Sequence, residues 1–102
     1  MTAPAVPMTE LLDEAALGLH EFARCACLAP EWVLTHVQAG VLQPASGASA
    51  AQWRFASATV LRARRIAELE HIYDADPQLA ALAADLIEEV AALRRALESL
   101  QI

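Results

Sequence analysis

The last quarter of this 102-residue chain is a single helical pattern without interruption, which leaves few folds open. Asp76 and Pro77 are typical of a helix N-cap and its first position, and neither Gly nor Pro occurs after them. The apolar residues there form a short a/d heptad seam. It predicts a long helix that pairs with a second copy through Leu79, Leu86, Val90, Leu93, Leu97 and Leu100. Packing within its own chain is the alternative, since Leu82 and Ile87 widen the stripe.

The chain is short and rich in alanine, so a monomer has little material for a core. Hydrophobic residues make up 57% of the sequence, and many of them are alanine, which buries little area. A single domain of this length lies at the lower end of the usual range. Association into an oligomer is consistent with that size.

The charges fall into three blocks. The formal net charge is −6, with 7 Arg, no Lys and 13 Asp or Glu. Residues 1–53 sum to −4, residues 54–65 to +4 and residues 66–102 to −6. Nucleic-acid binding draws on cations that release counterions at phosphates, so the overall field opposes it. Only the central block offers phosphate contacts, namely Arg54, Arg62, Arg64 and Arg65.

Two short helices joined by a tight turn are predicted at residues 21–27 and 30–39, which is the helix-turn-helix pattern. Pro30 suits the first position of the second helix, and Gly40 suits its left-handed C-cap. The outward side of the second helix carries only Glu31, Thr35 and Gln38. Because this side has no guanidinium fork for guanine, we expect the helix to recognise a protein rather than DNA.

A β-hairpin and a third helix are predicted next. VLQP and the alternating WRF flank a loop of small residues, which is typical of the wing of a winged helix-turn-helix. An extended segment is expected at residues 13–19, and Ser57 is the expected N-cap of the third helix. The inward side of that helix is expected to carry Val60, Ala63, Ile66, Ala67, Leu69 and Tyr73.

The predicted fold class is therefore mainly α. A flexible tail at residues 1–12 precedes a winged helix-turn-helix at 13–75, which has a small β-hairpin wing. The long C-terminal helix occupies residues 76–102.

Cys25 and Cys27 are the only cysteines, and they point about 200° apart around a helix, so they cannot bridge locally. We expect two small, half-buried residues in a reducing cytosol, with Phe22 and either Cys25 or Ala26 facing inward. A thiol or soft-metal sensor is the alternative. No second Cys or His pair has the spacing of a zinc site, so neither a metal nor a cofactor is expected.

No catalytic arrangement is evident in the sequence. It contains no Gly-rich phosphate loop, nucleophile elbow or HExxH motif, and no serine has a His and an acid nearby. We expect a protein that is not an enzyme. The N-terminus has neither a basic start nor an apolar run. Gly and Pro interrupt the uncharged residues 32–53, which excludes a membrane span there and predicts a cytoplasmic protein.

The order of these segments resembles the chaperone modulator CbpM family, which consists of small MerR-like proteins. The resemblance covers residues 17–100. It rests on Glu31 and Trp32, on GVLQP after that helix, on WRF, and on the apolar alternation in DLIEEVAALRRAL. It implies a MerR-like winged helix-turn-helix. It also implies a partner, the J-domain of CbpA, a DnaJ-type co-chaperone whose productive contact with DnaK the modulator blocks.

An acidic competitor would be steered to the basic J-domain face that engages DnaK. We therefore expect the partner site where the acids gather, at Glu68, Glu70, Asp74, Asp76, Asp85, Glu88 and Glu89. The alternative function is a MerR-like transcriptional regulator that binds DNA as a dimer through the four central arginines.

Overall fold

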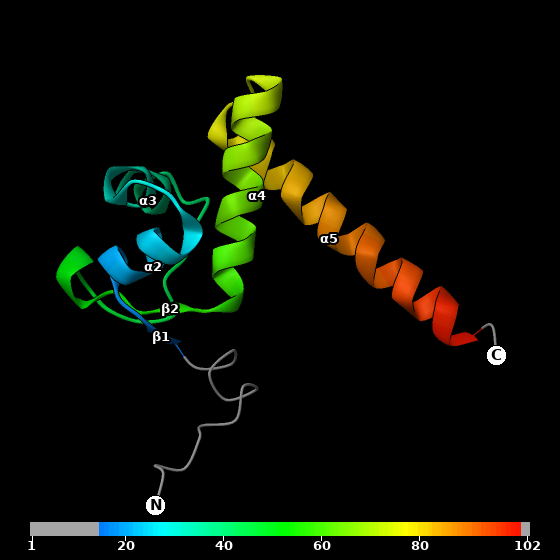
Figure 1. The fold of residues 1–102 in the computed structure, drawn as a ribbon, viewed down its shortest axis with the longest axis horizontal. Helices are drawn as coiled ribbons and strands as arrows, with labels where there is room; N and C mark the ends of the chain where they lie inside the picture. Colours follow the sequence, from blue (N-terminus) through cyan, green and yellow to red (C-terminus); the bar gives the residue numbers. More distant parts are fainter. Residues whose placement is uncertain (1–14, 101–102) are drawn as a thin grey trace, which may run out of the picture. The chain divides into compact units, whose positions relative to one another are not determined.

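The computed structural model describes residues 15–100, and in this range the protein is mainly helical, as predicted. Figure 1 shows, in chain order, β1 (Ala15–Leu17), α2 (Leu19–Ala26), α3 (Pro30–Gln38), the 3₁₀ turn η1 (Ala50–Gln52), β2 (Phe55–Ala56), α4 (Ala58–Tyr73) and α5 (Pro77–Leu100). The chain divides into two compact units, and the division falls between Arg64 and Arg65, within α4. The predicted tail at residues 1–12 lies outside the described residues.

Helices α2 and α3 pack against each other in the first unit, as the helix-turn-helix pattern predicts. Helix α2 ends in a Schellman motif, in which Cys27 adopts the left-handed conformation with φ 59°. The Cys27 N–H donates to the Arg24 carbonyl at 3.1 Å, and the Leu28 N–H donates to the Ala23 carbonyl at 2.9 Å. This motif satisfies the last carbonyls of α2 and reverses the chain within a few residues.

Helix α3 has the predicted bounds to within one residue and ends in a second Schellman motif. Gly40 has φ 81°, which confirms it as the left-handed C-cap. Its N–H donates to Val37 at 3.0 Å, and the Val41 N–H donates to His36 at 3.0 Å. At the other end, Ala29 provides no side-chain hydrogen bond to the first turn. The helix therefore starts on the fixed φ of Pro30 alone.

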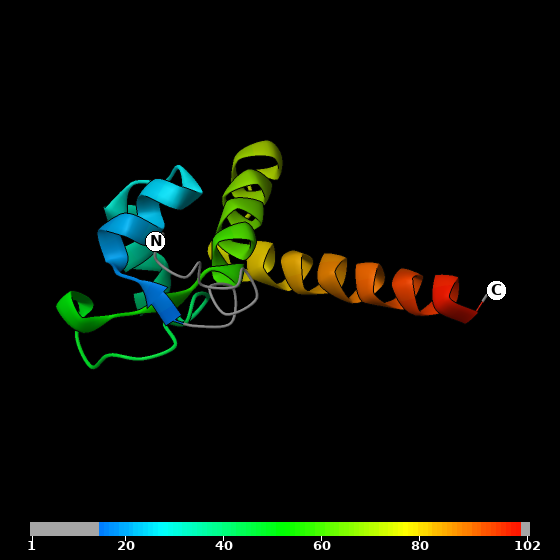
Figure 2. The same cartoon turned by 60° about the horizontal axis from the view of Figure 1, so that its bottom comes forward.

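The strands form one small antiparallel sheet, and Figure 2 shows β1 as a blue arrow next to the green segment that contains β2. Leu17 of β1 lies opposite Phe55 of β2. Of the extended segment expected at residues 13–19, residues 15–17 form a strand and residue 19 already begins α2, whereas residues 13 and 14 lie outside the described residues. This pairing ties the start of the described chain to the segment that leads into α4.

The hairpin was predicted to pair WRF with VLQP, and the structure shows a different pairing. WRF pairs through Arg54 with Ser46, beyond VLQP, in a single bridge. The Ala45 N–H donates to the Arg54 carbonyl at 2.8 Å, and the Arg54 N–H donates to the Ser46 carbonyl at 3.1 Å. Val41 and Leu42 take no part, because their N–H groups both donate to the His36 carbonyl, at 3.0 and 3.3 Å. The end of α3 therefore uses the groups that strand pairing would need, and both side chains are buried.

The core of the first unit is built around two phenylalanine rings. Phe22 and Phe55 are both 0% exposed, and their rings stack with centroids 4.3 Å apart. Trp53 meets Phe55 edge to face at 6.2 Å. His36 is a polar side chain in this core, 5% exposed, and it stacks on Trp32 while its Nδ1 lies 2.7 Å from the Trp32 carbonyl. Nδ1 must carry the proton there, since a carbonyl only accepts.

Gly47→Ala is expected to lower the free energy of unfolding by about 2–3 kcal/mol, because two costs combine. Gly47 has φ 104°, and a Cβ there would lie 2.3 Å from the Gln52 carbonyl oxygen. Gly40→Ala is the matched control, since Gly40 also has a positive φ but a Cβ there would meet nothing within 4 Å. It should cost only about 1 kcal/mol. Urea unfolding measures both, and equal costs would contradict the proposed clash.

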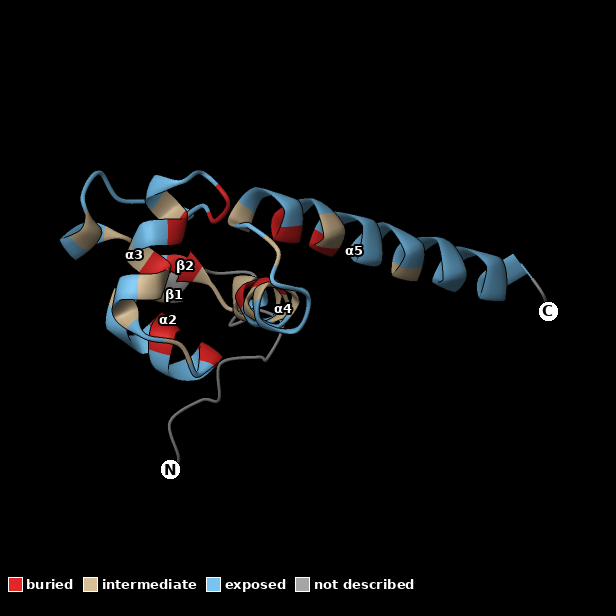
Figure 3. Cartoon of the chain, turned by 90° about the horizontal axis from the view of Figure 1, so that it is seen from above, coloured by how far each residue is buried: buried red, intermediate tan, exposed pale blue. Residues whose placement is uncertain are grey.

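In the second unit, alanine rather than leucine forms the buried side of α5. Ala80 and Ala84 are both 0% exposed, and Figure 3 shows buried residues only near the start of this helix. Leu82 and Ile87, which widen the stripe, remain 56% and 41% exposed. Ala80 and Ala84 lie about 100–140° around the helix from Leu79, so the alanine side and the leucine side are distinct surfaces.

Among residues 15–100, no helix combines the length and the apolar character that a membrane crossing requires.

Candidate protein-interaction site

The predicted acidic site centres on an elbow, defined here as residues 68–76, where α4 ends and α5 begins. Asp74 adopts the left-handed conformation with φ 51°, which Asp tolerates better than most residues. Asp76 is the N-cap of α5, and its Oδ1 accepts a hydrogen bond from the Leu79 N–H at 2.8 Å. These two backbone features fix the course of the chain between the helices.

The predicted acids are mostly exposed, as a partner site requires. Glu70 is half-buried, and the exposed ones are Glu68, Asp74, Asp76, Asp85, Glu88 and Glu89. No Lys or Arg occurs between Arg65 and Arg94, so the negative charge along this segment is uninterrupted. Three of the acids, Glu70, Asp85 and Glu88, also take part in interactions within the chain.

The structure divides these acids into two groups. Glu68, Glu70, Asp74 and Asp76 belong to the elbow. Asp85, Glu88 and Glu89 lie further along α5, and the first of them is about 13 Å from Asp76 at 1.5 Å per residue. The elbow group is the more constrained, because a left-handed residue and an N-cap hold it. We therefore take the elbow as the centre of the candidate site.

Two large apolar side chains are exposed at this elbow, and the sequence patterns did not identify them as site residues. Ile72 is 62% exposed and Tyr73 is 71% exposed. The prediction that Tyr73 faces inward is wrong, because this last residue of α4 is 71% exposed. The prediction holds for Ala63 and Ile66, which are both 0% exposed.

The six residues predicted for self-association form an uncovered apolar stripe along α5, with exposed fractions from 46% for Val90 to 80% for Leu100. The six share one face, since they recur at spacings of seven, four and three. Removing such a stripe from contact with water is favourable, by about 25 cal/mol per Å² of apolar area buried. This face of α5 is therefore suited to a second helix.

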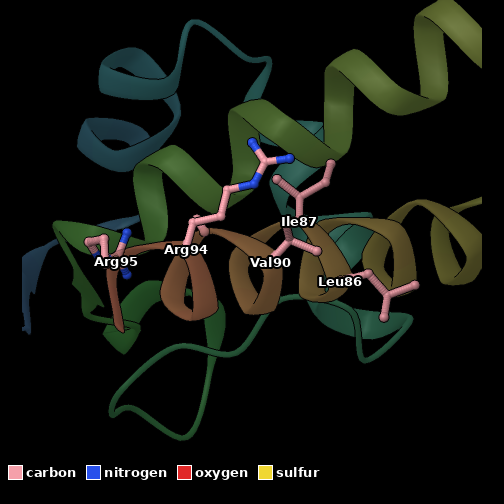
Figure 4. Close-up of a pocket in the computed structure, with 6 residues that line it drawn as sticks. Leu86, Ile87, Val90, Arg94 and Arg95 are labelled. Atoms are coloured by element: carbon pink, nitrogen blue, oxygen red, sulfur yellow. The ribbon is translucent and has the colours of Figure 1, made fainter. Parts of the chain in front are cut away.

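A groove of about 530 Å³ borders this stripe, and Figure 4 shows its lining. Its lining is Leu86, Ile87, Val90, Ala91, Arg94 and Arg95. Ile87 and Arg94 project from the same side of α5 in Figure 4. The guanidinium of Arg94 thus lies at the edge of an apolar surface, where a long charged side chain can extend its stem over apolar neighbours.

A helix-turn-helix protein that binds DNA would use the exposed side of α3 and the four central arginines. Glu31, Thr35 and Gln38 are exposed on α3, as predicted, and the Thr35 hydroxyl donates to the Glu31 carbonyl at 2.8 Å. That bond occupies one of the polar groups on this face. Of the four central arginines, Arg54 and Arg64 are exposed, whereas Arg62 and Arg65 are half-buried.

Arg62 lines a small polar pocket of about 320 Å³ in the first unit. Gly40, Val41, Gln43 and Thr59 complete its lining. Arg62 also takes part in an interaction within the chain. The pocket therefore adds no independent support for a phosphate contact.

The prediction of two half-buried cysteines is wrong. Cys25 and Cys27 are both exposed and unpaired as thiols, and Ala26 is the buried residue between them. Cys27 adopts the left-handed conformation at the end of α2, and its side chain is exposed there. No group of three or more His, Cys, Asp or Glu side chains is placed to hold a metal ion in the described part of the chain.

Comparison of the sequence with protein-family models and with curated proteins, and of the fold with solved structures, finds no match. The candidate site therefore rests on its own geometry, which combines exposed carboxylates, exposed apolar side chains and a fixed turn between two helices.

Proposed function

We propose that this protein is a chaperone modulator that binds the J-domain of a CbpA-like, DnaJ-type co-chaperone and inhibits its activity with DnaK. The observation that carries the proposal is the row of exposed carboxylates around the elbow, with no cation between Arg65 and Arg94. The J-domain face that engages DnaK is basic, so the two surfaces have opposite charge. Occupation of that face by the modulator would exclude DnaK.

The proposed inhibition requires binding but no catalysed reaction. In this proposal the protein is a non-catalytic regulator that acts in the cytoplasm. Individual exposed ion pairs contribute only about 0.2–1 kcal/mol each. Their main effects are to steer the encounter and to select the partner. The expected signature is therefore an association rate that falls as salt rises.

The proposed fold is a MerR-like winged helix-turn-helix. The packed pair α2 and α3 and the bridge between Ser46 and Arg54 support it, since they provide the two helices and a minimal wing. In this proposal α5 joins two copies through its apolar stripe. The exposed stripe residues support that role.

The test is a titration of the purified full-length protein with a purified J-domain and, in parallel, with duplex DNA. We expect J-domain binding that weakens as salt rises, together with loss of J-domain-stimulated ATP hydrolysis by DnaK. DNA binding at micromolar concentration in physiological salt, without J-domain binding, would support the MerR-like regulator instead. Such binding should fall by orders of magnitude between about 50 and 200 mM salt and should depend on the arginines.

Neutralising the elbow acids is expected to weaken J-domain binding about tenfold at low salt and to reduce its salt dependence. The variant is Glu68→Gln, Asp74→Asn and Asp76→Asn combined. Asn is accepted in the left-handed conformation and as an N-cap, so the elbow keeps its backbone. Isothermal titration calorimetry at two salt concentrations measures the effect.

The matched control removes the same amount of charge elsewhere, at Glu21→Gln, Glu31→Gln and Glu98→Gln, which are all exposed positions. It should bind the J-domain within about twofold of the parent, because none of these three acids belongs to the elbow. If both triple variants lose affinity equally, net charge rather than the elbow determines binding.

A further inference from the structure

Ile72 and Tyr73 are exposed to an extent that the fold does not require. They are 62% and 71% exposed, whereas Ile66, two turns earlier in α4, is 0% exposed. Isolated apolar residues on a surface are common. Two large adjacent ones beside a constrained turn are a more specific feature, because interface cores are enriched in aromatic side chains.

Carboxylates flank this apolar pair on both sides along the chain. Glu68 is one helical turn before Ile72, so the two side chains share a face of α4. Asp74 follows Tyr73 directly, and Asp76 caps the next helix. The arrangement is an apolar centre with a charged, exposed rim, which is the usual anatomy of a protein interface.

We propose that Ile72 and Tyr73 are the anchor of the partner site, and that Glu68, Asp74 and Asp76 form its rim. The occupant is a basic amphipathic helix that presents an apolar row flanked by Lys or Arg. This inference rests on the proposed function and adds to it the two side chains that hold the partner once it has docked. Sequence patterns placed the site on the carboxylates alone.

Charge complementarity decides among possible occupants of the elbow. A second copy would bring the same carboxylates face to face, and like charges in contact are costly. Nucleic acid and anionic lipid carry the same sign as the elbow. A cationic helix alone neutralises the rim while covering the apolar centre. A second copy has a separate surface in the stripe along α5, whose members are uncharged.

The anchor and the rim have different measurable effects. Exposed rim charges act mainly on the association rate and its salt dependence. A buried anchor acts mainly on the dissociation rate, because the loss of contact area shortens the life of the complex. Truncating the anchor should therefore weaken binding by the same factor at every salt concentration.

The experiment compares the full-length parent with Ile72→Ala combined with Tyr73→Ala, using a purified J-domain of a DnaJ-type co-chaperone as the probe. The control is Leu61→Ala, a 59% exposed residue on the same helix that is followed by Arg62 instead of an acid. We expect the double variant to bind about 10–100-fold more weakly with an unchanged salt slope. The control should stay within about twofold, because most contacts outside an anchor are near-neutral. Thermal unfolding of each variant verifies the fold.

The outcomes separate the two proposals. If the parent binds the J-domain and the elbow acids matter, but the double variant binds like the parent, the anchor is overturned and the proposed function stands. The anchor is also overturned if Leu61→Ala weakens binding as much as the double variant does. If the parent does not bind the J-domain at all, both proposals fall.

Discussion

Phe22→Ala is expected to lower the free energy of unfolding by about 3–5 kcal/mol, the usual range for a fully buried phenylalanine. Phe22 and Phe55 are both 0% exposed and stack at 4.3 Å, so the substitution leaves a cavity beside a ring that loses its partner. These rings connect α2 to β2, two elements far apart in the sequence. The whole stability of a small domain is about 5–15 kcal/mol, so the variant should be largely unfolded at modest denaturant concentrations.

Urea unfolding monitored by circular dichroism measures this loss. Phe22→Leu should cost less, because leucine fills part of the cavity. A double-mutant cycle with Phe55→Ala should give a coupling energy of about 0.5–1.5 kcal/mol for the stacked pair. Leu61→Ala, at an exposed site, should stay within about 0.5 kcal/mol of the parent. A cost for Phe22→Ala no larger than this control would show that the ring pair does not organise the core.

Leu93→Asp is expected to convert a dimer into a monomer, with a dissociation constant raised on the order of 100-fold or more. Leu93 lies in the middle of the α5 stripe and is 57% exposed in the single chain, so a second helix packed on the stripe would cover it. In a dimer the substitution removes two leucines and places two carboxylates in an apolar seam, where an unpaired charge is costly. Sedimentation velocity over a range of protein concentrations measures the change.

Ala92→Asp is the matched control, because it adds the same charge one residue earlier, at an exposed position about 100° around the helix. It should sediment like the parent. If parent, control and variant all sediment as monomers, α5 does not pair two copies. If all three sediment as dimers, the dimer forms through another surface.

The helix ends were predictable because residues that start or stop a helix mark them in the sequence. Pro30 and Gly40 delimit α3 because each has a backbone preference that acts without distant neighbours. Asp76 and Pro77 mark the start of α5 for the same reason, and the Asp76 hydrogen bond confirms the cap. Such signals are contained within a few residues, so a sequence pattern is sufficient to place them.

Features that depend on distant partners were less predictable. The wing pairs through Ser46, while the N–H groups of Val41 and Leu42 donate to the His36 carbonyl at the end of α3. Alternation in VLQP and WRF carries no information about that competition. Tyr73 has an inward phase on α4 but lies at the helix end, where the other described residues leave it 71% exposed. Periodicity gives the direction of a side chain, and burial requires something on that side.

The candidate site shows the same division. The acids could be listed from the sequence, and their exposure agrees with a binding role. Their separation into an elbow group and a group further along α5 required the position of the turn at Asp74. The exposure of Ile72 and Tyr73 could be recognised only from the structure. In the middle of a helix, the same two residues would be predicted to lie in the core.

The backbone at Asp74 and Asp76 has a consequence for how homologous chains diverge. The left-handed turn and the N-cap each accept Asn in place of Asp. Mutational drift can therefore erase two negative charges while preserving the bend between the helices. Chains with Asn at both positions would keep the bend between the helices but carry two fewer negative charges at the elbow.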